Sequence, residues 1–189
     1  MDGLGEQQPW GRKWAAILLA IWFMLGTLPI FVKMFGNDFV PSIEWVSKSE
    51  IIGIVAGIIG AALMPSIVLA GMRKPPKIDG KVKKASAVIF APLFGYLLGN
   101  TVVVVSVPMM LALIPGHQIE LIFTVESGDR GGSRKCRSPL ELHELPFLFD
   151  EICGVPEDFR QGLVSGQKIV VIGRGTDFGI FVQRLRKVD

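Results

Sequence analysis

Residues 85–114 read ASAVIFAPLFGYLLGNTVVVVSVPMMLALI and contain no charged side chain. A bilayer core about 30 Å thick is crossed by roughly 20 helical residues, so this stretch exceeds one crossing and is too short for two. Pro92 and Pro108 interrupt it, and we expect a single tilted helix that kinks near Pro108 and continues into the membrane interface. The alternative is a re-entrant hairpin that turns at Gly99 and Asn100. The choice decides on which side of the membrane the rest of the chain lies.

Two further apolar runs lie upstream, at residues 14–32 and 51–72, after an N-terminal segment of residues 1–13. Each run is uncharged and long enough to cross a bilayer. Half of all residues are apolar and the mean hydropathy is +0.47, more than in an ordinary soluble domain. We therefore predict a membrane protein with three transmembrane α-helices within residues 14–116. The first run is too long for a signal-peptide core and lacks a small-x-small cleavage site, which favours an uncleaved signal anchor.

The charges that flank these runs predict the orientation. The 73–84 loop carries six Lys or Arg residues and one acid, and Arg12 and Lys13 precede the first run. The 36–50 loop carries one Lys against three acids. Because short loops rich in Lys and Arg remain in the cytoplasm, we predict a multi-pass protein of the bacterial inner membrane with a cytoplasmic N-terminus and 73–84 loop. Three crossings then place residues 117–189 in the periplasm.

The chain has two cysteines, Cys136 and Cys153, and both lie within residues 117–189. Disulfides persist in oxidising compartments such as the periplasm. A bond between these cysteines would close a loop of about 17 residues and contribute on the order of 3 kcal/mol in the chain-entropy model. That contribution is large for so small a domain. We predict a disulfide, and the alternative is a pair of unrelated thiols, one of them buried.

The C-terminal segment has the pattern of a small β-rich domain, with alternating apolar and polar residues. The candidate strands are residues 118–125, 140–143, 168–173 and 178–185. We expect the last two to form a hairpin with a longer loop. Pro146 and Pro156 are each expected to start a helical turn, the first continuing through Cys153. The prediction is a small α+β, mainly β, extracytoplasmic domain of four or five strands, with a small barrel as one arrangement.

Small residues predict how the helices pack. Gly53 and Gly57 form a small-xxx-small pair in the second run, and Gly95 and Gly99 form another in the third. In lipid, close backbone approach through small residues is a common mode of helix association. We favour a contact between the second and third helices within one chain, and a contact between chains is the alternative. Asn100 can form a hydrogen bond across the bundle or cap a kink.

The sequence shows no set of residues typical of a catalytic or metal site. His143 lies between Glu141 and Glu144, and we expect Glu141 and His143 to form a surface pair on the solvated face of a strand. No second His or Cys occurs at zinc-ligand spacing, and neither a phosphate loop nor a nucleophile elbow occurs. We therefore predict no catalytic residue, no metal and no cofactor. A membrane enzyme that uses Glu141, His143 or an arginine-rich loop remains an alternative.

Charge and polarity argue against two other functional classes, nucleic-acid-binding proteins and ion-coupled transporters. Lys and Arg residues divide evenly around residue 117, without the one-sided basic surface of a nucleic-acid-binding protein. No ionisable residue lies in the middle of a span, which disfavours an ion-coupled transporter. The loop around residues 130–137 is basic, and it can contact lipid head groups or an acidic partner; a solvated loop is the alternative. Its basic residues are Arg130, Arg134, Lys135 and Arg137.

A short chain with a few spans, a disulfide-bearing outer domain and no catalytic set resembles membrane-resident bacterial immunity proteins. The resemblance concerns the layout alone and involves no shared motif. It implies a binding protein that neutralises a membrane- or periplasm-acting antibacterial toxin, with membrane lipid and a protein as partners. The alternative is an accessory or assembly subunit of a larger membrane complex. The sequence leaves the oligomeric state open.

Overall fold

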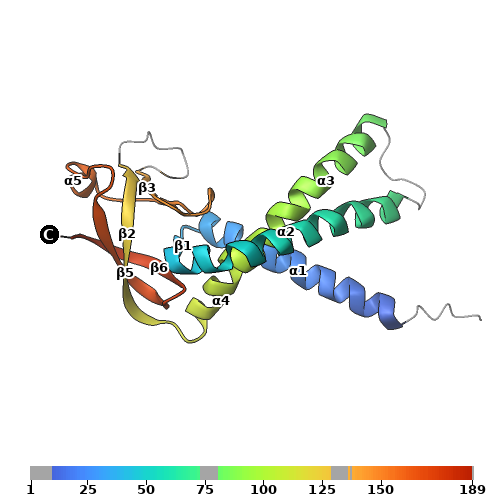
Figure 1. The fold of residues 1–189 in the computed structure, drawn as a ribbon, viewed down its shortest axis with the longest axis horizontal. Coiled ribbons are helices and arrows are strands. Elements are labelled where there is room, and N and C mark those ends of the chain that lie inside the picture. Colours follow the sequence, from blue (N-terminus) through green and yellow to red (C-terminus); the bar gives the residue numbers. More distant parts are fainter. Residues whose placement is uncertain (1–9, 73–80, 129–135, 137, 189) are drawn as a thin grey trace, which may run out of the picture.

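The computed structural model describes residues 10–72, 81–128, 136 and 138–188. Within them, three helical segments are long and apolar enough to span a membrane. All three leave the C-terminal domain on one side and spread apart with distance from it (Figure 1). The helical elements are α1 (Trp10–Met34), α2 (Ile43–Met72), α3 (Lys81–Thr101), the π-helical turn η1 (Val102–Ser106) and α4 (Val107–Leu113).

The third span is continuous. The chain passes from α3 through η1 into α4 without reversing direction (Figure 1), so the re-entrant hairpin at Gly99 and Asn100 is wrong. The irregular turn lies directly before Pro108, close to where we expected a kink. Proline has no amide N–H to continue the regular hydrogen-bond ladder, and a π turn is one way in which a helix accommodates such an interruption.

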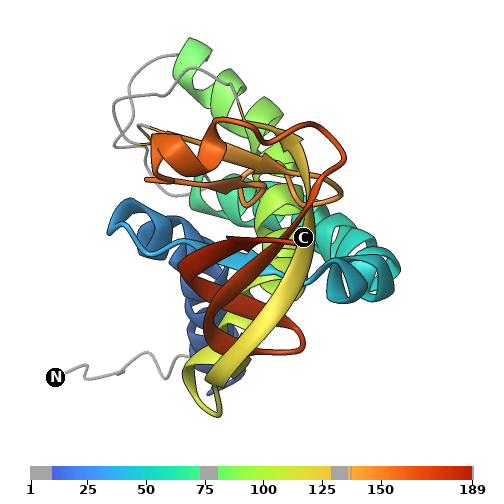
Figure 2. The same cartoon turned by 90° about the vertical axis from the view of Figure 1, so that its left-hand side faces the viewer.

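The C-terminal domain is built on an antiparallel sheet. Its strands are β1 (Phe39–Pro41), β2 (His117–Ser127), β3 (Leu140–Leu142), β4 (Glu151–Ile152), β5 (Lys168–Thr176) and β6 (Gly179–Lys187). Within the described residues they form one six-stranded sheet in the order β1-β6-β5-β2-β3-β4. Seen end-on in Figure 2, this sheet lies in front of the helices, with the short helix α5 (Glu157–Arg160) at its margin. In the part of the domain that the structure describes, β1 and β4 are the edge strands, so the sheet is open and is not a barrel.

Strand β1 comes from the segment between α1 and α2, not from the C-terminal part of the chain. Val40 of β1 pairs with Ile180 of β6, and Phe39 pairs with Phe181. The segment between the first two spans therefore lies at the same end of the helices as the C-terminal domain. The expected boundary at residue 117 misses this strand, because three residues are too few to show a strand period.

Successive side chains of β1 enter two different apolar cores, because neighbouring residues on a strand point to opposite faces. Val40 is fully buried within the C-terminal domain, among residues such as Phe123 and Ile169. Phe39 is buried on the other face, among Val105 and Met109 of the third span. The second core joins the sheet to the helices, so the C-terminal domain is packed directly on the bundle. It is called the outer domain below because it lies beyond the ends of the spans.

Helix α2 begins earlier than the apolar run that predicted it. The run begins at residue 51, whereas α2 begins at Ile43. The Ser42 hydroxyl oxygen accepts a hydrogen bond of 3.2 Å from the Trp45 amide, which is the contact of an N-cap residue. Glu44 then lies in the first turn, where a negative charge favours the helix dipole. The 36–50 segment is thus a strand followed by the start of a helix, not a loop.

Three of the expected strands are confirmed as β2, β3 and β5, and the β5–β6 hairpin is confirmed with a different turn. Only Asp177 and Phe178 connect its strands, so the expected longer loop is wrong. The expected helical turn from Pro146 through Cys153 is also wrong, since the chain there forms turns and then β4. Leu140 pairs with Ile152, and this pairing with β3 satisfies backbone groups that a helix would have satisfied internally. The turn after Pro156 is confirmed as α5.

Candidate functional site

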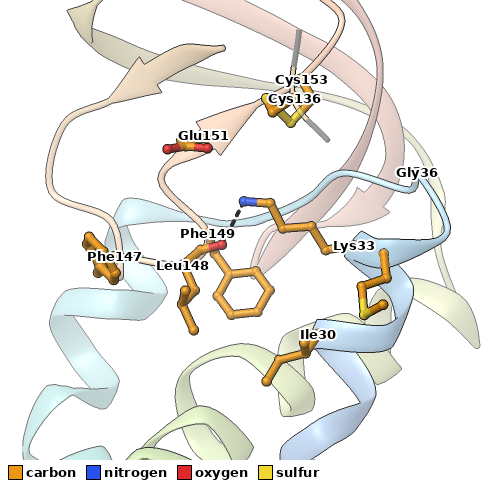
Figure 3. A pocket seen from close by; sticks show the side chains of 10 residues that line it. Ile30, Lys33, Gly36, Cys136, Phe147, Leu148, Phe149, Glu151 and Cys153 are labelled. Carbon is orange, nitrogen blue, oxygen red and sulfur yellow. Dashed lines mark hydrogen bonds between the residues drawn. A yellow bond between two sulfur atoms is a disulfide. The ribbon is translucent and has the colours of Figure 1, made fainter. Parts of the chain in front are cut away.

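A pocket of about 450 Å³ lies where the end of α1 meets the outer domain. Figure 3 shows Ile30 on α1 below it, the segment from Phe147 to Phe149 beside it, and the two cysteines above. Apolar side chains therefore line the part next to the helix, and polar groups line the part nearer the sheet. The lining residues are Ile30, Lys33, Met34, Gly36, Cys136, Phe147, Leu148, Phe149, Glu151 and Cys153.

Lys33, at the end of the first span, points into this pocket. Its ammonium group donates a hydrogen bond of 2.7 Å to the backbone carbonyl oxygen of Leu148, drawn as a dashed line in Figure 3. The same ammonium lies 5.9 Å from the centre of the Phe149 ring, within the range of a cation–π contact. These contacts hold the charge at the wall of the pocket. Two further N–H groups of the ammonium remain for other acceptors.

Asp38 connects the segment after α1 to the disulfide. One of its carboxylate oxygens accepts a hydrogen bond of 2.8 Å from the amide N–H of Cys153. Its backbone carbonyl accepts another, of 2.9 Å, from the amide N–H of Val182 in β6. Asp38 thus joins two parts of the outer domain that are far apart in sequence, directly beside β1.

Burial raises the pKa of the Asp38 carboxyl above its ordinary value, against the opposing effects of the Cys153 amide and the Lys33 ammonium. Burial likewise raises the pKa of Asp150, and the nearby Glu151 carboxylate adds to that increase. Partial desolvation and like charge both disfavour the ionised carboxylate. Of these acids, Glu151 lines the pocket itself, together with Lys33.

The cysteines form the upper wall of the pocket. Cys136 and Cys153 are joined in a disulfide, as predicted. Glu151 brings a carboxylate oxygen close to them, so that the donor atoms of the three residues lie within 4.8 Å of one another. Sulfur atoms joined in a disulfide provide no thiolate for a metal ion. In the oxidised protein this cluster is therefore a wall of the pocket and not a metal site.

The glycines singled out in the spans lie at the contact between α2 and α3. A methyl group on Gly60 would collide with the carbonyl oxygen of Gly95, and one on Gly99 would collide with that of Ala56. A methyl group on Gly57 would meet the Tyr96 ring at 2.7 Å. The helices approach within one chain to a distance that only glycine allows at these positions.

Gly53 and Asn100 lie at the same contact. A methyl group on Gly53 would lie 2.9 Å from the Val104 side chain and 3.4 Å from the amide nitrogen of Asn100. This closeness places the half-buried Asn100 at the helix contact. Its neighbourhood belongs to the bundle and not to the pocket.

The remaining sequence candidates do not gather at the pocket. Arg130, Arg134, Lys135 and Arg137 lie outside the described residues. The expected surface pair of Glu141 and His143 is wrong, because Glu141 is only 8% exposed whereas His143 is exposed. His143 instead approaches Glu144, at 3.7 Å. Glu141 lies on β3 between two strands, where its neighbours cover it.

Sequence reasoning missed the residues that make the pocket, apart from its cysteines. Lys33 was visible as the first charge after the first span, and Asp38 as an acid in the following segment. The contacts that give these residues a role are made with Leu148 and Cys153, each 115 positions away. No local pattern along the chain encodes such a contact.

Comparisons with known proteins assign neither a family nor a function to the chain. No protein-family model matches the chain, and neither does any curated protein or solved structure. The function is therefore inferred from the geometry of the molecule itself.

Proposed function

We propose that the chain is a non-enzymatic binding protein of the bacterial inner membrane, and that it acts as an immunity protein against a membrane- or periplasm-acting toxin. The observation that carries the proposal is the attachment of the outer domain to the bundle. Phe39 and Met109 belong to one buried core between the sheet and the spans. A domain held in this way is a fixed surface at the membrane boundary, suited to meeting a partner there.

The arrangement of reactive side chains supports a binding role. The two cysteines are bonded to each other, and both histidines, His117 and His143, are exposed at the ends of strands. Serine 106 is buried, but its hydroxyl contacts backbone carbonyl groups within the bundle. These five residues, of types that often act as nucleophiles or bases, therefore have structural partners or lie on open surface.

Charge supports a periplasmic outer domain. Strand β1 lies at the same end of the helices as the C-terminal domain, and the segment that contains it carries more acids than bases. The opposite end is connected by the strongly basic 73–84 loop. Lys- and Arg-rich loops remain cytoplasmic. A reporter fused after Asp189 should therefore be active only if it functions in the periplasm, and activity of a cytosol-dependent reporter would overturn this orientation.

A deletion experiment tests the immunity function. Cells without the gene should lose viability when challenged with toxins from neighbouring strains, and re-expression of the chain should restore survival. An expressed variant that lacks both cysteines provides a comparison for the importance of the outer domain. Equal survival of the deletion strain and its parent against every toxin would overturn the proposal.

The spread of α1 away from the other helices favours a second candidate, an accessory subunit of a larger membrane complex. Figure 1 shows that α1 diverges from α2 and α3 toward its N-terminal end, and large apolar side chains such as Leu18 and Ile21 are exposed there. Another membrane helix could pack on this surface. Purification of the full chain in mild detergent from its own cells should then yield a stable complex with other membrane subunits, and recovery of the chain alone would reject this candidate.

A further inference from the structure

The pocket between α1 and the outer domain has two chemically different ends. Near its lower end lie Ile30 of α1 and, beside it, Phe147 and Leu148, all of them apolar (Figure 3). Its upper end brings in the charged groups of Lys33 and Glu151. This lining matches an amphiphile, with an apolar part alongside the helix and a polar part under the sheet.

The apolar end opens at the membrane boundary. The first candidate span includes residues up to Met34, so the last turn of α1 lies where hydrocarbon gives way to head groups. Met34 is 63% exposed, and Phe147 is 84% exposed on the facing segment. Large apolar side chains exposed together at this level indicate contact with lipid. A ligand can therefore enter the pocket directly from the leaflet on the side of the C-terminal domain.

At the polar end of the pocket, the charged groups of Lys33 and Glu151 are not joined in a salt bridge. Among the described residues, neither Lys33 nor Glu151 forms a salt bridge. Lys33 is held by the Leu148 carbonyl and presents its remaining N–H groups to the pocket. A ligand that carries an anion and a hydrogen-bonding cation could satisfy both groups at once.

The balance of charge around the pocket selects among lipid head groups. Among the described lining residues, Lys33 and Glu151 contribute one charge of each sign. Such a lining favours a head group that carries both a phosphate and a cation over one with net negative charge. A primary ammonium offers N–H donors to Glu151, whereas a trimethylated one offers none.

We propose that this pocket binds a glycerophospholipid with a phosphoethanolamine head group. Its phosphate contacts the Lys33 ammonium, its primary ammonium contacts the Glu151 carboxylate, and an acyl chain lies along Ile30 and Met34. The lipid would fill the junction between the first span and the outer domain. This site is independent of any protein partner and does not depend on the proposed immunity function.

Native mass spectrometry of the full chain with defined lipids tests the proposal. We expect one tightly bound phosphatidylethanolamine, with weaker binding of phosphatidylglycerol and phosphatidylcholine. Glu151→Gln should lower the preference for phosphatidylethanolamine about tenfold, as for loss of one charge-assisted hydrogen bond. Lys33→Gln should weaken binding of phosphatidylethanolamine and phosphatidylglycerol alike. Glycerophosphoethanolamine, the head group without acyl chains, should compete only weakly with phosphatidylethanolamine for the pocket.

The exposed ion pair between Lys48 and Glu44 supplies the matched control, since it lies near the start of α2 and outside the pocket lining. Lys48→Gln and Glu44→Gln remove the same charges and should leave lipid preference unchanged. Equal binding of the three lipids, or an unchanged preference in Glu151→Gln, would overturn the proposal. So would an equal loss in the control variants, which would indicate a general surface effect.

A crosslinking measurement covers the case in which Glu151→Gln lowers the yield of folded protein. A benzophenone amino acid at Phe147 in the otherwise unchanged chain should form adducts with phosphatidylethanolamine on illumination in a mixed-lipid membrane. The same group at Val164, exposed near α5, is the control and should form none. Equal adducts at the two positions, or adducts that follow bulk lipid composition, would overturn the assignment.

Discussion

The Ser106 hydroxyl donates a hydrogen bond of 2.7 Å to the backbone carbonyl oxygen of Leu25, which joins the π-helical turn of the third span to the first span. Leu25 lies four residues before Pro29. Proline has no N–H, so this carbonyl loses its ordinary donor within α1. Ser106 is 1% exposed and supplies the missing donor from another helix. The two spans are thus connected where one of them cannot satisfy its own backbone.

Replacing Ser106 by alanine should therefore destabilise the bundle. Hydrogen bonds between membrane helices contribute about 0.6 kcal/mol on average and up to about 1.7 kcal/mol. We expect a loss near the upper value, measured by unfolding in mixed detergent micelles. Ser66→Ala is the control, since its hydroxyl donates to Ala62 within its own helix on an exposed surface. Equal effects of the two substitutions would contradict the role given to Ser106.

Replacing Asp38 by alanine should destabilise the outer domain, because it leaves the Cys153 amide without its acceptor. Loss of one partner of a partly buried hydrogen bond costs about 1–3 kcal/mol. Asp38→Asn retains an oxygen acceptor and should cost less. Thermal unfolding in detergent compares the two variants, and a smaller loss for alanine than for asparagine would contradict the assignment.

Asp38 should also contribute a pH dependence. Its pKa is raised in the folded protein, so the folded state binds the proton more tightly than the unfolded state. Its contribution to stability is therefore fully present below the ordinary value of 3.8 and is lost as the pH rises through the raised pKa. The Tm of Asp38→Asn relative to the parent should be higher at pH 7 than at acidic pH. A difference that does not change with pH would reject this prediction.

Removing the disulfide should weaken the outer domain. The double substitution of Cys136 and Cys153 by serine should cost about 3 kcal/mol in the chain-entropy model, measured as a lower midpoint of denaturant unfolding. In the parent protein, a thiol-alkylating reagent should add mass only after reduction. Labelling of both thiols in the native, unreduced protein would contradict the bond.

Adding a methyl group at Gly60 should separate α2 from α3. The Gly95 carbonyl occupies the space that the new methyl group needs. The collision is relieved only if the backbone of α2 or α3 moves. Overpacking of this kind costs about 1–3 kcal/mol. Ala62→Val adds bulk at an exposed position of the same helix and should have little effect. Unfolding in mixed micelles distinguishes them, and equal stability of the two variants would place Gly60 outside the contact.

Local patterns along the chain were sufficient for the elements that are long and regular. Uncharged runs predict three spans because a bilayer excludes charge over about 20 residues of helix. Alternation over residues 118–125 predicts β2, since one face of the strand is buried. The two cysteines predict the disulfide because no other cysteine competes for either of them.

Contacts between distant parts of the chain decided the rest. Strand β1 is three residues long, and it exists because Val40 and Phe39 each have a core to enter once the bundle and the sheet are assembled. Lys33 and Asp38 acquire partners 115 residues away for the same reason. A three-residue segment has little intrinsic preference for a strand, and an isolated charged residue does not specify its partner. Their conformation and their contacts are therefore set by the residues that the folded chain brings next to them.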